Sequence, residues 1–109
     1  MIFFKHIFIF SFFFSLILNA NATSYFISTS LGNDNNNGLS SNQPFKSIEK
    51  LNSITFQAGD SILFKAGESW EGMFWLKGSG DSNNSIVVDI YGGVGKATIN
   101  GNGYQSCIL

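Results

Sequence analysis

The clearest pattern of the chain begins at Gly59-Asp60 and continues as alternating apolar and polar positions. Across residues 61–65, Ile62 and Phe64 face one way and the positions between them face the other. Gly59 tolerates a positive φ, and the Asp60 carboxylate can accept from nearby backbone N–H groups. This pattern predicts a turn followed by a five-residue strand.

The same design, a short strand bounded by Gly-rich turns, recurs to the end of the chain, and an earlier strand precedes it. The expected strands are 25–29, 61–65, 73–77, 86–91, 97–100 and 107–109. Their spacing fits both a β-sandwich and a β-solenoid. Since no ten-residue helix separates the strands, a βαβ sheet is excluded.

One amphipathic helix is predicted before the main run of strands. Pro44 is suited to the first helical position, and Phe45, Ile48 and Leu51 recur every three residues with polar positions between them. We therefore expect a helix of about three turns over 44–54. Its place before the strands suits a terminal cap, which, with the irregular Gly turns, favours the solenoid.

Residues 1–22 have the pattern of a secretory signal peptide. Lys5 and His6 precede an apolar stretch at 7–18, and Ala20-Asn21-Ala22 is a small-x-small cleavage site. The stretch is short of the roughly 20 residues that span a bilayer, although a membrane anchor that is never cleaved is the alternative. We expect export and a mature chain that begins at Thr23.

Composition narrows the function classes. Seven of the twelve Phe residues lie in 1–22, and the chain contains no Arg. After residue 22, five Lys face seven acids, so nucleic acid is a poor partner. Cys107 is the only cysteine, which rules out an internal disulfide. Because the only histidine is in the signal, we interpret Cys107 as a small buried apolar side chain.

The Asn-rich run after the first strand invites comparison with a calcium-binding loop. Asn33, Asn35 and Asn37 followed by Gly38 imitate the start of an EF-hand, but the first ligand is not Asp. The twelfth position is Pro44, where a bidentate Glu is required. A compact Asn-rich turn is the favoured interpretation.

Some acidic residues are candidate catalytic groups. Glu68 and Glu71 lie on a turn beside Trp70, where a pair of carboxylates could serve glycoside hydrolysis, but two solvated turn acids are the favoured interpretation. Asp60 is explained by its turn. Asp89 faces outward on a strand, but one carboxylate does not make a calcium site. The remaining acids are Asp34, Glu49 and Asp81.

Four aromatic residues could stack on sugar rings, but we expect them to pack under the cap or along the strands. They are Trp70, Trp75, Tyr91 and Tyr104. Asn83-Asn84-Ser85 fits an N-glycosylation acceptor in a host that glycosylates. The Gly-rich segment at 92–95 is not a dinucleotide loop, because no crossover helix follows it.

Taken in order, these segments resemble a known superfamily. The run Y-F-I-S, G-N-D-N-N-N-G-L-S, P-F-K-S-I-E-K, A-G-D-S-I-L-F-K-A-G-E-S-W and Y-G-G-V-G-K-A-T-I-N-G spans residues 25–101. It resembles the N-terminal region of secreted right-handed parallel β-helix proteins of the pectate-lyase-like superfamily. The resemblance implies a cap made of the Asn/Gly loop and the helix, and an opening turn at G-D-x-I. It also implies that active residues lie on later turns, so no catalytic, cofactor-binding or metal residue is assigned here.

The expected organisation is therefore a signal peptide at 1–22, an N-terminal cap at 23–58 and the first, incomplete turns of a mostly β solenoid at 59–109. By resemblance, the intact protein is secreted and binds or cleaves an extracellular polysaccharide, as a lyase or a glycoside hydrolase. The alternatives are a non-catalytic β-helix surface or adhesion protein and a small β-sandwich carbohydrate-binding module. This stretch alone is expected to be inactive and to need no cofactor, whereas the resemblance allows calcium in the intact protein. The sequence leaves open whether Glu68, Glu71 or Trp70 contacts a ligand.

Overall fold

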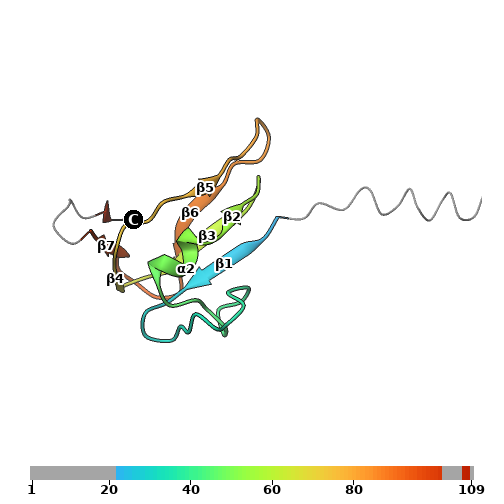
Figure 1. Ribbon diagram of the computed structural model, residues 1–109. Coiled ribbons are helices and arrows are strands. Elements are labelled where there is room, and N and C mark those ends of the chain that lie inside the picture. Colours follow the sequence, from blue (N-terminus) through green and yellow to red (C-terminus); the bar gives the residue numbers. More distant parts are fainter. Residues whose placement is uncertain (1–21, 102–106, 109) are drawn as a thin grey trace, which may run out of the picture.

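The computed structural model describes residues 22–101 and the backbone of 107–108 (Figure 1). Within these residues the chain is mostly β, with short strands and one small helix, and it forms no closed barrel. The elements are β1 (Ser24–Ile27), α2 (Ile48–Asn52), β2 (Thr55–Phe56), β3 (Ser61–Lys65), β4 (Ser69–Glu71), β5 (Lys77–Gly78), β6 (Val87–Tyr91), β7 (Thr98–Asn100) and β8 (Cys107–Ile108).

Three parallel ladders organise the strands. One sheet has the order β1-β3-β6, a second pairs β2 with β5, and a third pairs β4 with β7. The chain visits the three ladders as β2, β3, β4 and then again as β5, β6, β7, so the second set lies beside the first, strand by strand (Figure 1). Such parallel pairing does not fit a sandwich of antiparallel sheets.

The predicted strand at 61–65 is confirmed as β3, and its alternation sets the core. Ile62 and Phe64 are fully buried, and their partners on β6, Val88 and Ile90, pack against the same core. The core cluster joins all three ladders and α2. Its buried members are Ile27, Phe45, Ile48, Leu51, Phe56, Ile62, Phe64, Trp70, Ala97 and Ile99.

The helix is shorter than predicted and begins later. Ser47 is its N-cap, with a side chain that accepts from the Lys50 N–H at 3.1 Å, so α2 has five residues rather than about eleven. Pro44 does not open the helix, because the next residue, Phe45, still pairs with β1. The Phe45 N–H donates to the Phe26 carbonyl at 2.9 Å, as in a strand pair. The chain at Phe45 is therefore extended and not helical.

The predicted strand at 73–77 is also wrong. The structure has β4 before it and β5 at its end, and residues 73–76 lie in neither. The Asn52 side chain is the reason, because its amide bonds the Met73 carbonyl and the Trp75 N–H, each at 2.8 Å. These backbone groups are therefore not free for a ladder. β2 was not predicted at all, and β8 pairs with β7 antiparallel rather than continuing the parallel stack.

The Asn-rich run is a compact turn, as predicted. Asn33 and Asn37 accept from the N–H groups of Asn35 and Leu39, each at 2.8 Å, so their side chains serve their own loop. Gly38 has φ of 72°, and a Cβ there would lie 2.3 Å from the Phe45 ring. Only glycine fits this position.

The predicted signal at 1–22 lies almost entirely outside the described residues. Over 22–101 and 107–108, none of the helical structure has the length and apolar character needed to cross a membrane.

Candidate functional site

Glu68 is neither a free turn acid nor half of a catalytic pair. Its Oε1 accepts from the Ser28 hydroxyl and the Thr29 N–H, both at 2.8 Å, and from the Thr29 hydroxyl at 3.2 Å. Its Oε2 accepts from the Ser30 hydroxyl. Glu68 therefore ties the end of β1 to the turn between β3 and β4, and its carboxylate is occupied.

The same contacts set the ionisation of Glu68. Burial alone would raise the pKa of its carboxyl group, but the hydrogen bonds from Ser30, Ser28 and Thr29 outweigh burial and lower the pKa below its usual value. A carboxyl group with a lowered pKa stays ionised at neutral pH and therefore has no proton to donate as a general acid. Glu71, by contrast, is exposed on β4.

Asp60 is a structural residue, as predicted. It is 2 % exposed, and its carboxylate accepts from the Thr23 N–H at 2.9 Å and from the Gln57 N–H at 2.8 Å. It thereby fastens the chain before β1 to the turn before β3. The prediction named the local turn, whereas the contact with Thr23 crosses 37 positions and has no signal in the sequence.

Asp34 holds the start of the helix, a role that the sequence did not show. Its Oδ1 accepts from the N–H groups of Lys46 and Ser47, at 2.8 and 2.9 Å, and its Oδ2 accepts from the Ser47 hydroxyl at 2.6 Å. Burial opposes ionisation, but the bonds from Ser47 and Lys46 and the charge of Lys50 prevail, so the pKa of Asp34 is lowered.

The other acids do not assemble a metal site. Asp81 closes its own turn by accepting from the Asn83 and Asn84 N–H groups, at 2.9 and 2.8 Å. Asp89 faces outward, as predicted, but its partner on the adjacent strand is Leu63, which offers no ligand. No group of three or more His, Cys, Asp or Glu gathers anywhere in the part of the chain that the structure describes.

The two tryptophans differ in their exposure to solvent. Trp70 is 2 % exposed and packs edge-on against Phe64, with ring centroids 5.0 Å apart, so it is a core residue with no access to ligand. Its buried Nε1 has no hydrogen-bond partner among the residues that the structure describes. Trp75 is 64 % exposed, so the expectation of packing is wrong for this residue. Trp75 is therefore the candidate for stacking on a ligand.

Of the two candidate tyrosines and Cys107, the structure describes the side chain of Tyr91. Tyr91 packs edge-on against Phe26, with ring centroids 5.1 Å apart. Its hydroxyl is buried and, within the described part of the chain, has no hydrogen-bond partner. Burial, and then the charge of Glu68, raise the pKa of Tyr91. Tyr104 and the side chain of Cys107 lie outside what the structure describes.

The segment at 73–76 and the outer face of α2 together form the candidate site, which we call the Trp75 face. Its members are Glu49, Asn52, Glu71, Gly72, Met73 and Trp75. Glu49 and Asn52 are one helical turn apart, so both point toward this segment. A Cβ on Gly72 would lie 3.5 Å from the Glu49 Oε2, which places that carboxylate directly over the chain next to Glu71.

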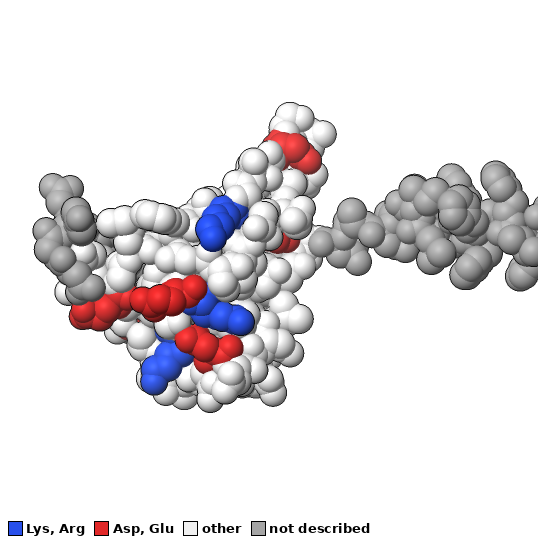
Figure 2. Space-filling view, in the orientation of Figure 1, with Lys and Arg blue, Asp and Glu red and all other residues white. Residues whose placement is uncertain are grey.

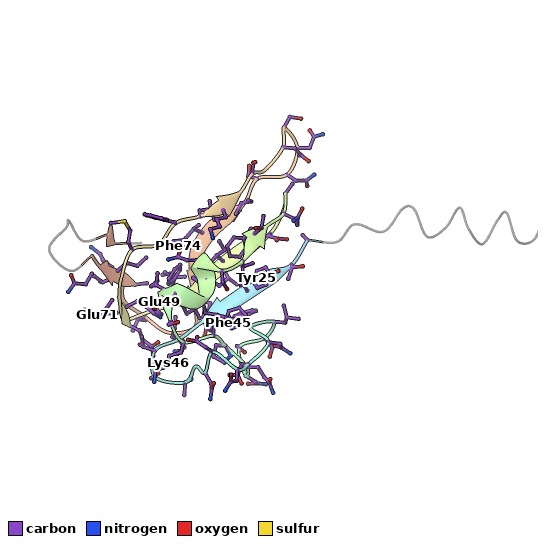
Figure 3. All side chains as sticks on the ribbon, in the orientation of Figure 1. Tyr25, Phe45, Lys46, Glu49, Glu71 and Phe74 are labelled. Atoms are coloured by element: carbon purple, nitrogen blue, oxygen red, sulfur yellow. The ribbon has the colours of Figure 1, made fainter. Side chains whose placement is uncertain are left out.

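Figure 2 shows a row of acidic side chains on this side of the molecule, and Figure 3 identifies Glu49 and Glu71 at that place, with Phe74 nearby. Sequence reasoning treated Glu49 only as an available acid and missed Asn52. The signal was present, because Glu49 and Asn52 share the polar side of the helical pattern.

The described residues thus combine parallel β-ladders with a small helix and, beside that helix, an exposed tryptophan and exposed carboxylates. No known family model matches the chain. The chain is 33% identical over 92 residues to the lacto-N-biosidase of Bifidobacterium longum subsp. longum, a match that covers 79% of this chain and 6% of that protein.

Solved structures give the same likeness. Two crystal structures of the GH136 lacto-N-biosidase from Eubacterium ramulus, the selenomethionine derivative and the native protein, match with TM-scores of 0.61 and 0.62 and identities of 32% and 30%. Each match covers 66% of this chain and 12% of the solved chain. The homologues are thus carbohydrate-active enzymes, while the expected pectate-lyase-like superfamily is not confirmed. The chain spans only a small part of the proteins it matches.

Proposed function

We propose that the described residues form the cap and the first turns of a right-handed parallel β-helix. Support comes from the ladders, in which Thr55, Ser61 and Ser69 pair with Lys77, Val87 and Thr98, which lie 22 to 29 residues later. Offsets of this size are typical of a solenoid whose turns each bury one face against the next. The helix α2 contributes its two apolar side chains to the core beside the first turn.

We infer further that the intact protein acts on an extracellular glycan by glycoside hydrolysis rather than by a lyase reaction. The observation that supports this most directly is the 32–33% identity to lacto-N-biosidases, over 79% and 66% of this chain. In such a reaction, water adds across a glycosidic bond, so that one sugar gains a free anomeric hydroxyl and the other regains its own hydroxyl. No catalytic residue is assigned within 22–101.

Export and calcium are part of the same proposal. Cleavage after Ala22 would release the chain beginning at Thr23 outside the cell, where an oligosaccharide substrate is met. Calcium would be held by oxygen ligands elsewhere in the intact protein, since a calcium ion takes six to eight of them.

The test uses the full-length protein produced with its own N-terminus and collected from the culture medium. We expect an N-terminus at Thr23 by mass spectrometry and release of the aryl group from an aryl lacto-N-bioside, assayed with and without a chelator. Formation of unsaturated sugar ends from polygalacturonate should stay at background. Retention of residues 1–22 would contradict export, and unsaturated products would contradict hydrolysis.

One outcome would favour the alternative of a non-catalytic surface protein. If the full-length protein binds oligosaccharides but hydrolyses none of a panel of hexose- and N-acetylhexosamine-containing glycans, the hydrolase proposal fails and the adhesion protein is preferred.

A further inference from the structure

The segment at 73–76 presents apolar side chains to solvent. Met73, Trp75 and Leu76 are 42, 64 and 45 % exposed, while Phe74 between them points inward and lies 5.8 Å from the Phe64 ring. Scattered exposed apolar residues are ordinary, but three within four positions around one tryptophan form a patch. The patch needs an explanation that core packing does not provide.

The exposure of Trp75 does not come from a loose loop. The Asn52 amide holds the segment on both sides, donating to the Met73 carbonyl and accepting from the Trp75 N–H, each at 2.8 Å. Phe74 anchors the middle of the segment in the core. A ligand that meets Trp75 therefore pays little to order the backbone beneath the indole, because that backbone is already fixed.

Two carboxylates lie at the start of the same segment, near Gly72. Glu49 lies over Gly72, and Glu71 precedes it on β4, where it is exposed. Across the described residues, neither carboxylate forms an ion pair or a recorded hydrogen bond, and the neighbouring ammonium of Lys50 lies over the Phe45 ring at 5.3 Å. Each carboxylate thus has free acceptor oxygens.

We propose that the Trp75 face is an accessory binding surface for a neutral sugar ring. The indole offers a flat apolar surface to the C–H side of a pyranose. Glu49 and Glu71, which lie beside Gly72 at the start of the segment, accept from hydroxyl groups of adjoining rings of the same oligosaccharide in charge-assisted hydrogen bonds. An acidic sugar such as a uronate is disfavoured, because its carboxylate would face two like charges. The inference deepens the proposed function and rests on it, since it names the ligand class of one surface.

A direct readout comes from 19F NMR of the full-length protein labelled with 5-fluorotryptophan. The Trp75 resonance is assigned by its absence in Trp75→Phe. We expect this resonance to shift on titration with neutral oligosaccharides of hexose and N-acetylhexosamine, including lacto-N-biose, and to stay in place with oligogalacturonate. A resonance that responds equally to oligogalacturonate, or to neither, contradicts the proposal.

Affinity measurements by calorimetry complete the test. Trp75→Ala should weaken binding of the neutral oligosaccharides about 3- to 10-fold, and Glu49→Gln or Glu71→Gln should weaken it less. Val94→Ala, an apolar truncation at a residue that is 91 % exposed elsewhere, is the matched control and should leave binding unchanged. Asn52→Ala should also weaken binding, because it frees the backbone of Trp75.

The two proposals fail in different ways. If the wild-type protein binds or hydrolyses oligosaccharides and Trp75→Ala behaves identically, the Trp75 face is wrong and the proposed function stands. If the wild-type protein neither binds nor hydrolyses any oligosaccharide, the function itself is wrong. If acrylamide does not reach Trp75 in the full-length protein, another part of the protein covers this face, and the sugar surface is refuted.

Discussion

The contacts of Glu68 with the Ser28–Thr29–Ser30 segment give the sharpest stability prediction. Glu68→Gln keeps the shape of the side chain but removes its charge and turns one acceptor into a donor. The Thr29 N–H and the hydroxyl of the fully buried Ser28 keep a single amide oxygen that carries no charge, and the NH2 group replaces the oxygen that accepts from the Ser30 hydroxyl. The segment at 28–30 should therefore open more often.

The size of the effect follows from the kind of bond that is lost. Hydrogen bonds to a charged group contribute about 1.5–3 kcal/mol each, but Glu68 is partly solvated and the hydroxyl groups can turn to water. We therefore expect Glu68→Gln to lower the free energy of local opening of residues 28–30 by about 1.5–2 kcal/mol. At tenfold for every 1.4 kcal/mol, the Thr29 amide should exchange about 10- to 30-fold faster.

The assay is hydrogen exchange by mass spectrometry on the full-length protein, read from a peptide that covers residues 26–32. Glu71→Gln is the matched control, because Glu71 is exposed at the end of β4, three residues after Glu68. Among the described residues, its side chain forms no hydrogen bond with residues 28–30. The control should exchange like the wild type. Equal exchange of Glu68→Gln and wild type at neutral pH would refute the role given to Glu68.

The lowered pKa of Glu68 adds a pH dependence with a definite sign. Because the folded pKa lies below the unfolded one, the stabilisation is complete above the ordinary pKa of glutamate and disappears as the pH falls through the folded pKa. After correction for intrinsic rates, wild-type protection at 26–32 should fall in that acidic range, whereas Glu68→Gln should stay flat. A flat wild-type profile would contradict the linkage.

Two further substitutions test the packing, both by thermal unfolding of the full-length protein. Tyr91→Phe removes a buried hydroxyl without a partner and keeps the contact with Phe26, so stability should be unchanged or rise by up to about 1 kcal/mol; a clear loss would show that the hydroxyl has a partner. Gly38→Ala combines a positive φ with overlap on the Phe45 ring and should cost about 2–4 kcal/mol. Gly93→Ala should cost about 1 kcal/mol, because its φ is also positive but its Cβ would meet the nearest atoms only at 3.6 Å or more. Equal losses would contradict the steric argument.

The sequence predicted the strand interior well because alternation is local. Ile62 and Phe64 alternate with polar or surface positions, and burial of one face needs no knowledge of the partner strand. Parallel pairing, by contrast, brings together residues that lie 22 to 37 positions apart, and no local pattern encodes that choice between a solenoid and a sandwich.

The errors have a common origin in side chains that bond backbone at long range. Pro44 looked like a helix start, but Asp34 and the N-cap Ser47 set the first helical residue four positions later. The strand at 73–77 looked plausible until Asn52 took its backbone groups. Propensity and periodicity describe a residue and its neighbours, so a bond from a distant side chain is invisible to them.

The fates of Trp70 and Trp75 were partly readable. The two residues are five positions apart, and an odd separation in extended chain places side chains on opposite faces. Since Trp70 falls at the centre of β4 and faces the core, Trp75 is expected to face outward, as it does. What the sequence did not show is that Asn52 would fix the backbone of Trp75.

The helix α2 links the interior to the Trp75 face. A five-residue helix has almost no stability of its own, so α2 depends on the burial of Ile48 and Leu51 and on the cap at Ser47. The polar side of the same helix supplies Glu49 and Asn52 to the exposed segment at 73–76. Any change that loosens the start of α2 must therefore also loosen the backbone beneath Trp75, although the two are separated along the chain. The helix α2 thus packs on the apolar core and, through its outer side, sets the geometry of the surface where a sugar is proposed to bind.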